Sequence, residues 1–218
     1  MDKFSKVARP ALEGEILQKR KVKEDIFIHF KETLNSYYEL SESSFEALCL
    51  IAKEKKVKKG SILIDLGEIP LKFYFLHKGL FRAYAISDDS SREVNKSFFM
   101  EGRFPSSVIA ALDKVPSDIC IESLEDSILL EINHDGYRKL LNECEDLKWF
   151  HIRYLEQHWV REKEPDVFSL LGGDAKKRYL DFEKNNPEMM SRVPLFHLVS
   201  RIGITPTQLS RIRKSLKS

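Results

Sequence analysis

The hydrophobic pattern is clearest near the C-terminal end of the chain, where it predicts two short helices. The first has apolar residues at the i, i+3, i+4 and i+7 positions that share one helix face: Leu195, Leu198, Val199 and Ile202. Gly203 follows, and glycine often ends a helix because it adopts positive φ without strain. The second helix is expected to bury Leu209, Ile212 and Leu216.

The start of the second helix carries several local signals. Thr205 is a good N-cap, and Pro206 suits the first helical position because its missing N–H would have no partner there. Gln208, three residues after Thr205, completes a capping box. The opposite face carries hydroxyls and cations, namely Thr207, Ser210, Arg211 and Lys214. Two such helices joined by a tight turn predict a helix-turn-helix, whose second helix enters the DNA major groove.

The middle of the chain has a different pattern, made of short β-like runs. They start at Ile62 and Ile64 and continue at residues 73–77, 79–86, 94–99, 119–124 and 127–132. Turn signals such as Gly67 and Lys78-Gly79 separate them. Many short strands at this spacing predict an all-β sandwich, barrel or jelly roll.

Helical patterns flank this β-region. Residues 24–56 are predicted to be helical, with Ser41 as an N-cap between the apolar staple residues Leu40 and Phe45. The apolar face of that segment is expected to continue through Leu48, Ile51 and Ala52. Residues 1–23 are polar, basic and weakly periodic, so we expect a frayed or loosely docked extension.

A long helix is predicted after Asn133, with large side chains along one side. The stripe is Trp149, Ile152, Leu155 or Glu156, and Trp159, widened by Phe150 and Tyr154. Such a stripe either packs against the β-region or forms the seam of a dimer, and we favour the dimer because the β-region has a core of its own. Pro165 is expected to end or kink this helix, and Gly172-Gly173 to form a hinge or tight turn. A further helix is predicted at residues 175–184.

Composition narrows the function without changing this layout. The chain has 218 residues, is 42% hydrophobic and has a net charge of +2, but its last 27 residues hold six Lys or Arg and no Asp or Glu. Positive charge in one terminal module indicates contact with nucleic acid there, the alternative being a solvated basic hairpin. The widely spaced Cys49, Cys120 and Cys144 disfavour a disulfide framework, a zinc site and an iron–sulfur cluster. No apolar run reaches about 18 residues, so we expect a cytoplasmic protein without membrane contact.

Four motifs, taken in order, carry a family resemblance. The most specific is IGITPTQLSRIRK at residues 202–214, and weaker ones lie at residues 56–60 with Gly67-Glu68, at 73–82 and at 121–127. They resemble the Crp/Fnr superfamily of bacterial transcription regulators, and most closely its compact members of the Bacteroidetes type. The similarity runs over roughly residues 24–218.

The resemblance implies an α+β fold in three parts. Residues 24–145 would form a double-stranded β-helix (jelly roll) of the cyclic-nucleotide-binding type, residues 146–172 a connecting dimer helix, and residues 173–218 the helix-turn-helix domain. The sequence given ends at Ser218, directly after the second helix, so no β-wing is expected. Binding of a homodimer to an inverted repeat in double-stranded DNA follows from the same likeness.

The second helix supplies the side chains expected to touch DNA. Arg211 is expected to read a guanine through two hydrogen bonds, and Thr207 and Ser210 to reach bases or phosphates. Arg213, Lys214 and Lys217 are expected to contact phosphates, although the stem of Arg213 can instead cover the buried face. The complete predicted DNA-binding set is Thr205, Thr207, Gln208, Ser210, Arg211, Arg213, Lys214 and Lys217.

Cyclic-nucleotide-binding members of the superfamily hold their ligand with a Gly-Glu pair and a phosphate-binding Arg, which are replaced here. The acid position falls at Ser107 and the Arg position at Ser117, beside Asp118. A buried phosphate without a cation is costly, so a response to cyclic AMP is not expected unless Arg103 or Lys114 supplies the charge. The candidate pocket residues are Arg103, Ser106, Ser107 and Ser117. An unidentified effector and RNA polymerase stay open as partners, and no cofactor or metal is assigned.

Two other classes of protein compete with this prediction. A metabolic enzyme of the double-stranded β-helix type needs clustered histidines and carboxylates, but His77 is the only histidine among the predicted strands. The glutamates of those strands are not spaced to join it: Glu93, Glu122 and Glu131. No nucleophile motif or phosphate-binding loop indicates catalysis. A small-ligand-binding signalling module without DNA binding is the other alternative, which the basic C-terminal helices disfavour.

Overall fold

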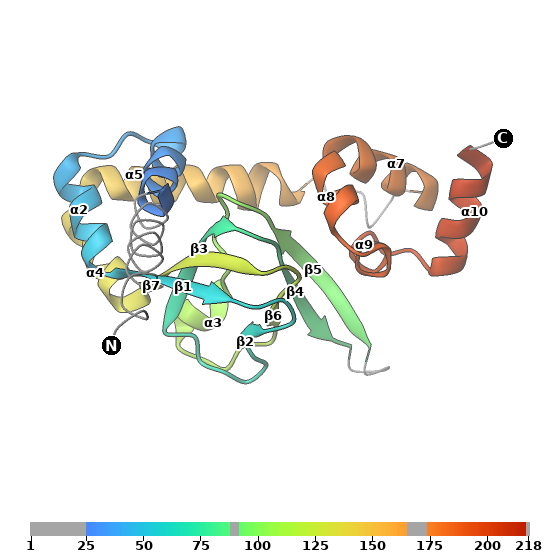
Figure 1. Cartoon of the computed structure of the whole chain (residues 1–218), viewed down its shortest axis with the longest axis horizontal. Helices are drawn as coiled ribbons and strands as arrows, with labels where there is room; N and C mark the ends of the chain where they lie inside the picture. Colours follow the sequence, from blue (N-terminus) through green and yellow to red (C-terminus); the bar gives the residue numbers. More distant parts are fainter. Residues whose placement is uncertain (1–24, 88–91, 165–173, 217–218) are drawn as a thin grey trace, which may run out of the picture.

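The computed structural model describes residues 25–87, 92–164 and 174–216. Figure 1 shows a β-roll below a long helix, with a group of C-terminal helices beside the roll. The α+β architecture agrees with the sequence prediction. The predicted extension at residues 1–23, Pro165 and Gly172-Gly173 lie outside the described residues.

Two antiparallel sheets form the β-roll. One has the order β1–β7–β3, built from Ala52–Val57, Ser127–Asn133 and Lys72–Lys78. The other has the order β2–β6–β4–β5, built from Ile62–Ile64, Cys120–Ser123, Phe81–Ile86 and Glu93–Phe99. Strands that follow one another, such as β3 and β4 or β6 and β7, belong to different sheets. The chain therefore crosses repeatedly between the sheets, as in a jelly roll.

Alternation along each strand decides which side chains meet between the sheets. In β3, Tyr74 and Leu76 belong to a core shared with Phe81 and Ile121 of the other sheet. Phe75 of the same strand belongs to a second core, formed with the helices. The β1–β7–β3 sheet is thus buried on both faces, which explains why β3 and β7 read as nearly continuous apolar runs.

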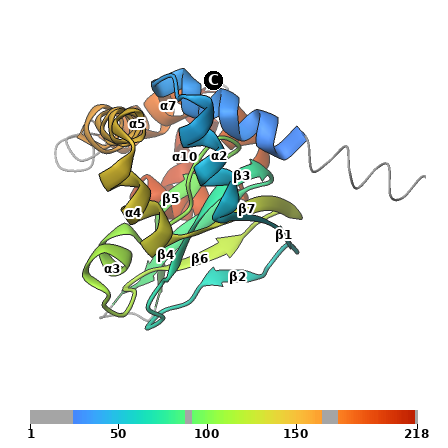
Figure 2. The same cartoon turned by 90° about the vertical axis from the view of Figure 1, so that its left-hand side faces the viewer.

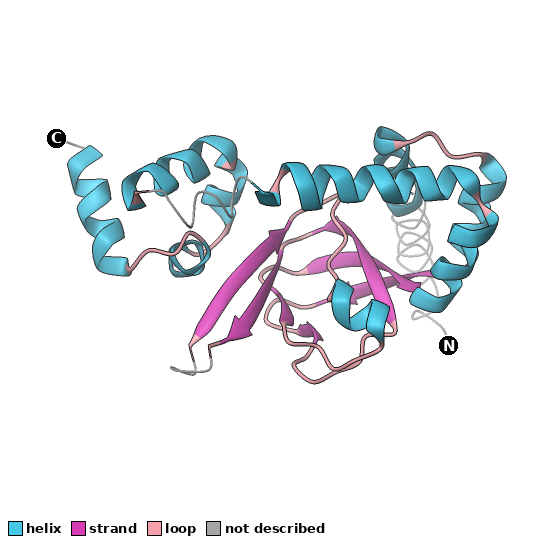
Figure 3. Ribbon diagram, turned by 180° about the vertical axis from the view of Figure 1, so that it is seen from behind, coloured by secondary structure: helices cyan, strands magenta, loops and turns pink. Residues whose placement is uncertain are grey.

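Helices cover the outer face of the β1–β7–β3 sheet (Figure 2). They are residues 25–37, α2 (Glu42–Leu50), α4 (His134–Glu143) and α5 (Glu145–Leu155). Their core includes side chains that are almost inaccessible to solvent, namely Ile26, Phe30, Leu34, Leu48, Leu130 and Leu147. The short helix α3 (Val108–Asp113) lies beside the strands, below the long helix in Figure 3.

The prediction of helix over residues 24–56 is correct for its first part and wrong for its last. Ser41 caps α2 as expected, with its hydroxyl accepting the Ser44 N–H at 3.3 Å. Ala52, expected on a helix face, instead begins β1 and pairs with Ile132 of β7. Residues 53–56 read Lys-Glu-Lys-Lys, which favours helix by local propensity. Pairing along β7 overrides that propensity, because a strand is stabilised by its neighbours more than by its own residues.

α5 continues into a π-helical turn, η1 (Glu156–Arg161), and the two form the long helix of Figure 1. Phe150, Tyr154 and His158 follow at intervals of four residues and all lie against the ring of Tyr37. In an α-helix of 3.6 residues per turn, side chains four positions apart point in gradually different directions around the axis. The wider π-turn, with i→i+5 bonds, reduces that drift and keeps the three rings turned toward Tyr37.

The C-terminal helices are α7 (Ala175–Asn185), α8 (Pro187–Arg192), α9 (Leu195–Arg201) and α10 (Pro206–Leu216). α7 confirms the helix predicted at residues 175–184, whereas α8 was not predicted. Cys49, Cys120 and Cys144 are free thiols. Among the described residues, no helix combines the length and the apolar character needed to cross a bilayer.

Candidate nucleic-acid interface

α7, α9 and α10 share a small apolar core of their own. It contains Tyr179 from α7, Val199 and Ile202 from α9, and Leu209 and Ile212 from α10. The prediction that Leu195 and Leu216 lie on the buried faces is wrong, since they are 37% and 45% exposed. Each is the terminal residue of its helix in the structure and lies at the rim of the core.

The turn between α9 and α10 has the predicted geometry. Gly203 adopts a φ of 65°, and Ile204 packs into the core directly after it. Thr205 and Gln208 form the capping box: the Gln208 N–H donates to Thr205 Oγ1 at 3.1 Å, and the Thr205 N–H donates to Gln208 Oε1 at 2.7 Å. The two bonds satisfy backbone donors that a helix start otherwise leaves open, and so fix where α10 begins.

The outer face of α10 is open to solvent. Its exposed side chains include those predicted to face outward, Thr207, Ser210, Arg211 and Lys214. No Asp or Glu occurs between Pro206 and Leu216. Hydroxyls and cations on an exposed helix are the groups that donate to DNA phosphates and base edges. The residues that the structure describes therefore leave this face uncovered and chemically suited to DNA.

Three members of the predicted DNA-binding set differ from the rest. Gln208 uses its side-chain oxygen in the capping box, which leaves its amide nitrogen as the group able to reach outward. Arg213 is exposed but lies near Tyr179 of α7. Burial and Glu183 raise the pKa of Tyr179, and the positive charge of Arg213 partly opposes this rise. Arg213 therefore sits at the flank of the buried face. Lys217 lies outside the described residues.

Arg178 of α7 supports the turn and was not identified from the sequence. Its Nε donates to the Ile202 carbonyl at 2.9 Å and its Nη2 to the Gly203 carbonyl at 3.0 Å. The C-terminal carbonyls of a helix lack intrahelical partners, and cations are favourable there. Arg178 thus fixes the end of α9 from outside the two-helix motif, and no spacing rule links it to residues 24 or 25 positions later in the chain.

α9 packs against β5, the edge strand of its sheet. The Asn95 N–H donates to Ser200 Oγ at 3.0 Å, and Asn95 Nδ2 donates to the His197 carbonyl at 3.2 Å. Arg82 Nη1 donates to His197 Nδ1 at 3.1 Å. Burial, together with Arg82, lowers the pKa of His197 to about 4, so its imidazole is neutral at pH 7. α9 therefore covers part of a sheet edge that would otherwise present unpaired backbone groups.

The predicted ligand-pocket residues fall into two places. Ser107 and Ser117 lie together, buried, with the Ser117 hydroxyl donating to Ser107 Oγ at 2.8 Å. The N–H of Ile119 in turn donates to Ser117 Oγ at 3.3 Å. Two neutral hydroxyls thus occupy the positions where the resemblance placed an acid and an arginine. Ser106, beside them in sequence, is half-buried.

The two nearby cations are engaged elsewhere. Arg103 Nη1 donates to Glu162 Oε2 at 3.0 Å, and Lys114 pairs with Asp135 at 3.2 Å. Although burial raises the pKa of Glu162, its hydrogen bond to His158 and the charge of Arg103 lower it to about 2 overall. Arg103 is therefore directed to the long helix rather than to the paired serines. The Nε of Arg103 is buried and has no hydrogen-bond partner among the described residues.

An apolar stripe runs along the outer side of the long helix. Trp149, Ile152 and Trp159 are each 42% exposed, and Val160 is 53% exposed. Phe150 and Tyr154, expected to widen this stripe, instead pack inward on Phe104 of the roll. The remaining stripe residues stay partly exposed, although Trp149 also stacks on Tyr38. Their role as a dimer seam stays a prediction.

Comparison with known proteins finds a match for the β-roll. Residues 54–144 match the cyclic nucleotide-binding domain family. They comprise most of β1, the strands β2 to β7, and the helices α3 and α4. A search of curated protein sequences finds no match.

Solved structures extend the likeness to the C-terminal helices. The c-di-GMP-responsive global regulator CLP of Xanthomonas campestris is 15% identical, with a TM-score of 0.58 over 81% of this chain and 92% of that one. The catabolite activator protein of Thermus thermophilus is 14% identical, with a TM-score of 0.52 over 85% and 86%. A cyclic nucleotide-binding domain from Methylobacillus flagellatus is 15% identical, with a TM-score of 0.55 over 63% and 79%. At these identities the likeness shows the fold.

Proposed function

We propose that this protein is a DNA-binding transcriptional regulator of the Crp/Fnr type. The observation that carries the proposal is the exposed, acid-free face of α10, which a capping box starts and a three-helix core supports. The likeness of fold to the Xanthomonas campestris and Thermus thermophilus regulators supports it over most of the chain. In this proposal α10 enters the major groove, Arg211 reads a guanine, and Lys214 contacts phosphate.

The regulator acts as a homodimer in this proposal. The apolar stripe of Trp149, Ile152, Trp159 and Val160 forms the seam, since a second copy brings the same stripe to face it across a two-fold axis. The two recognition helices then contact half-sites about 34 Å apart on one side of the duplex. The operator is accordingly an inverted repeat.

The direct test is selection of bound fragments from random duplex DNA by the purified full chain. An enriched inverted repeat is the expected result, with retention that falls steeply as salt is raised because phosphate contacts release counterions. Failure to retain any duplex at low salt would overturn the proposal.

Two substitutions on α10 are expected to separate base reading from phosphate contact. Arg211→Ala should remove about 1–3 kcal/mol of discrimination at one base pair of each half-site. Lys214→Ala should weaken binding to all sequences about equally and reduce the salt dependence by about one phosphate. Selection repeated with each variant, together with salt titrations, checks both. Unchanged sequence preference in Arg211→Ala would remove that residue from the reading role.

A second candidate function, a small-ligand signalling module without DNA binding, is favoured by one observation, the family match of residues 54–144. The Ser107–Ser117 pair limits its chemistry, because two neutral hydroxyls cannot balance a cyclic phosphate. We expect calorimetry to detect no cyclic AMP binding tighter than a Kd of about 1 mM. Adenosine is the matched control, since it lacks the phosphate. Tight binding of cyclic AMP but not adenosine would contradict this expectation and favour the second candidate.

A further inference from the structure

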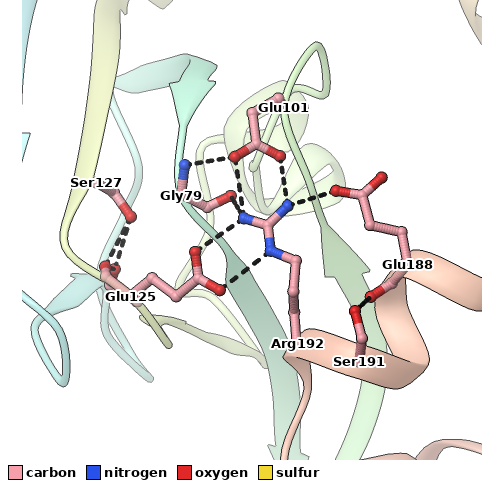
Figure 4. A network of polar contacts seen from close by, with 8 residues as sticks. Gly79, Glu101, Glu125, Ser127, Glu188, Ser191 and Arg192 are labelled. Atoms are coloured by element: carbon pink, nitrogen blue, oxygen red, sulfur yellow. Dashed lines mark hydrogen bonds and ion pairs between the residues drawn. The ribbon is translucent and has the colours of Figure 1, made fainter.

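Arg192, the last residue of α8, joins the C-terminal helices to the β-roll (Figure 4). Its Nη1 and Nη2 donate to the two carboxylate oxygens of Glu101 at 2.8 and 2.9 Å. Its Nε and Nη2 donate to the two oxygens of Glu125 at 3.1 and 2.8 Å. Nη2 also donates to the Gly79 carbonyl at 3.0 Å, and Nη1 to Glu188 within α8 at 2.8 Å. We call Arg192 with Gly79, Glu101 and Glu125 the Arg192 clamp.

The partners of Arg192 in the roll come from three separate turns. Gly79 lies between β3 and β4, Glu101 follows β5, and Glu125 lies between β6 and β7. The Gly79 N–H donates to Glu101 Oε1 at 2.8 Å, so the roll itself orients that carboxylate. Burial raises the pKa of Glu101, but the bonds from Arg192 and Gly79 outweigh it and the pKa is lowered overall. Glu101 is therefore a carboxylate at neutral pH, opposite the Arg192 guanidinium.

Apolar contacts close the same boundary beside the clamp. Leu80, Phe98 and Leu124 of the roll share a buried cluster with Val193 and Leu198 of the C-terminal segment. Further along β5, the Asn95–Ser200 hydrogen bond ties the edge strand to α9. Charge, apolar burial and edge-strand contacts thus all hold α9 against the roll. α10 keeps its place relative to α9 because the two helices share a core.

We propose that Arg192 is a positioning residue for DNA recognition, because its clamp fixes the direction of α10 relative to the roll and so the separation of the two recognition helices in the dimer. The inference rests on the proposed function. Two helices held at a set separation favour one spacing between half-sites and penalise others. An arginine suits this position because its planar fork binds two carboxylates in bidentate fashion, which a lysine cannot do.

The first readout needs no DNA. Hydrogen exchange of the Asn95 amide, measured by NMR on the full chain, reports docking because that N–H donates to Ser200 of α9. Arg192→Gln is expected to speed this exchange by about tenfold. Removing charge-assisted hydrogen bonds weakens docking of α9, and the Asn95 amide loses protection by that factor. Arg192→Lys should give an intermediate rate. Lys184→Gln, an equal charge change at an exposed site on α7, is the control and should leave the rate unchanged.

The second readout is spacing preference. Operators are compared in which the selected half-sites are unchanged but their separation differs by one or two base pairs. The wild type and Lys184→Gln should strongly prefer one spacing, whereas Arg192→Gln should lose about tenfold of that preference while keeping the same base preferences within each half-site. A purely stabilising role would lower binding to every spacing alike.

The outcomes separate the two proposals. Unchanged Asn95 exchange in Arg192→Gln would overturn the clamp as a positioning device, whatever the DNA results. Faster exchange with an unchanged spacing preference would likewise overturn the positioning role. Absence of DNA binding by the wild type would overturn the proposed function, and with it the spacing inference, even if the exchange measurement showed that the clamp holds the two parts together.

Discussion

If the proposed dimer forms through the apolar stripe, replacing Ile152 with glutamate is expected to convert it into a monomer. Affinity for the proposed two-half-site operator should then fall by about a hundredfold or more, because linked binding of two sites gains factors of that size. Ile152 lies in the middle of the exposed stripe on the long helix, between Trp149 and Trp159. A carboxylate buried at the centre of an apolar seam has no partner, and its desolvation opposes association. Glutamate is a good helix former, so α5 itself should stay folded.

Analytical ultracentrifugation and operator binding measure this effect on the same samples. The control is Ile69→Glu, because Ile69 is exposed to nearly the same extent (43% against 42%) but lies in the connection between β2 and β3. It should leave both mass and affinity unchanged. A variant Ile152→Glu that remained dimeric would show that the stripe is not the seam.

Replacing Gly79 with alanine is expected to destabilise the fold by roughly 3–5 kcal/mol, the sum of a strained backbone and an overpacked site. Gly79 has a φ of +116°, and an added Cβ would lie 2.0 Å from Ser127 Oγ and 2.9 Å from Ser127 Cα. The backbone of β7 cannot move aside without disturbing its pairing with both β1 and β3. The substitution should also loosen the Arg192 clamp, since the Gly79 carbonyl accepts from Arg192.

Urea unfolding of the variant and the wild type gives the difference in free energy. Gly67→Ala is the matched control: Gly67 also has positive φ (+79°), but an added Cβ there meets no atom within 4 Å. Gly67→Ala should lower the free energy of unfolding by about 1–2 kcal/mol, because it strains the backbone without creating a steric clash. Equal losses in the two variants would mean that the contact with Ser127 relaxes at little cost.

The parts of this structure that the sequence predicted correctly are those determined by neighbouring residues. The capping box of Thr205 and Gln208 and the stop at Gly203 depend on residues within one turn, and the structure confirms them. The predicted runs that became β2 to β7 were found because turn residues bound them. β1 was missed, because only its pairing with β7 distinguishes Lys-Glu-Lys-Lys in a strand from the same residues in a helix.

Contacts between distant segments could not be predicted in this way. Arg192 meets carboxylates 67 and 91 residues away, and nothing around Arg192 in the sequence marks those partners. Arg178 likewise reaches the turn from a helix outside the two-helix motif. Phe150 and Tyr154 looked like part of the outer stripe because they border it on the helix, and only their contact with the distant Phe104 shows that they face inward.

The π-turn of η1 has a bearing on how related chains diverge. Such a turn accommodates one surplus residue without breaking the helix. Removing it would rotate every later residue by about 100° around the axis, as one step of an α-helix does. In this protein that would turn Glu162 away from Arg103. The chain would then leave the end of the long helix in a different direction. A single codon gained or lost in this stretch is therefore a short evolutionary route to a new arrangement of the segments beyond it.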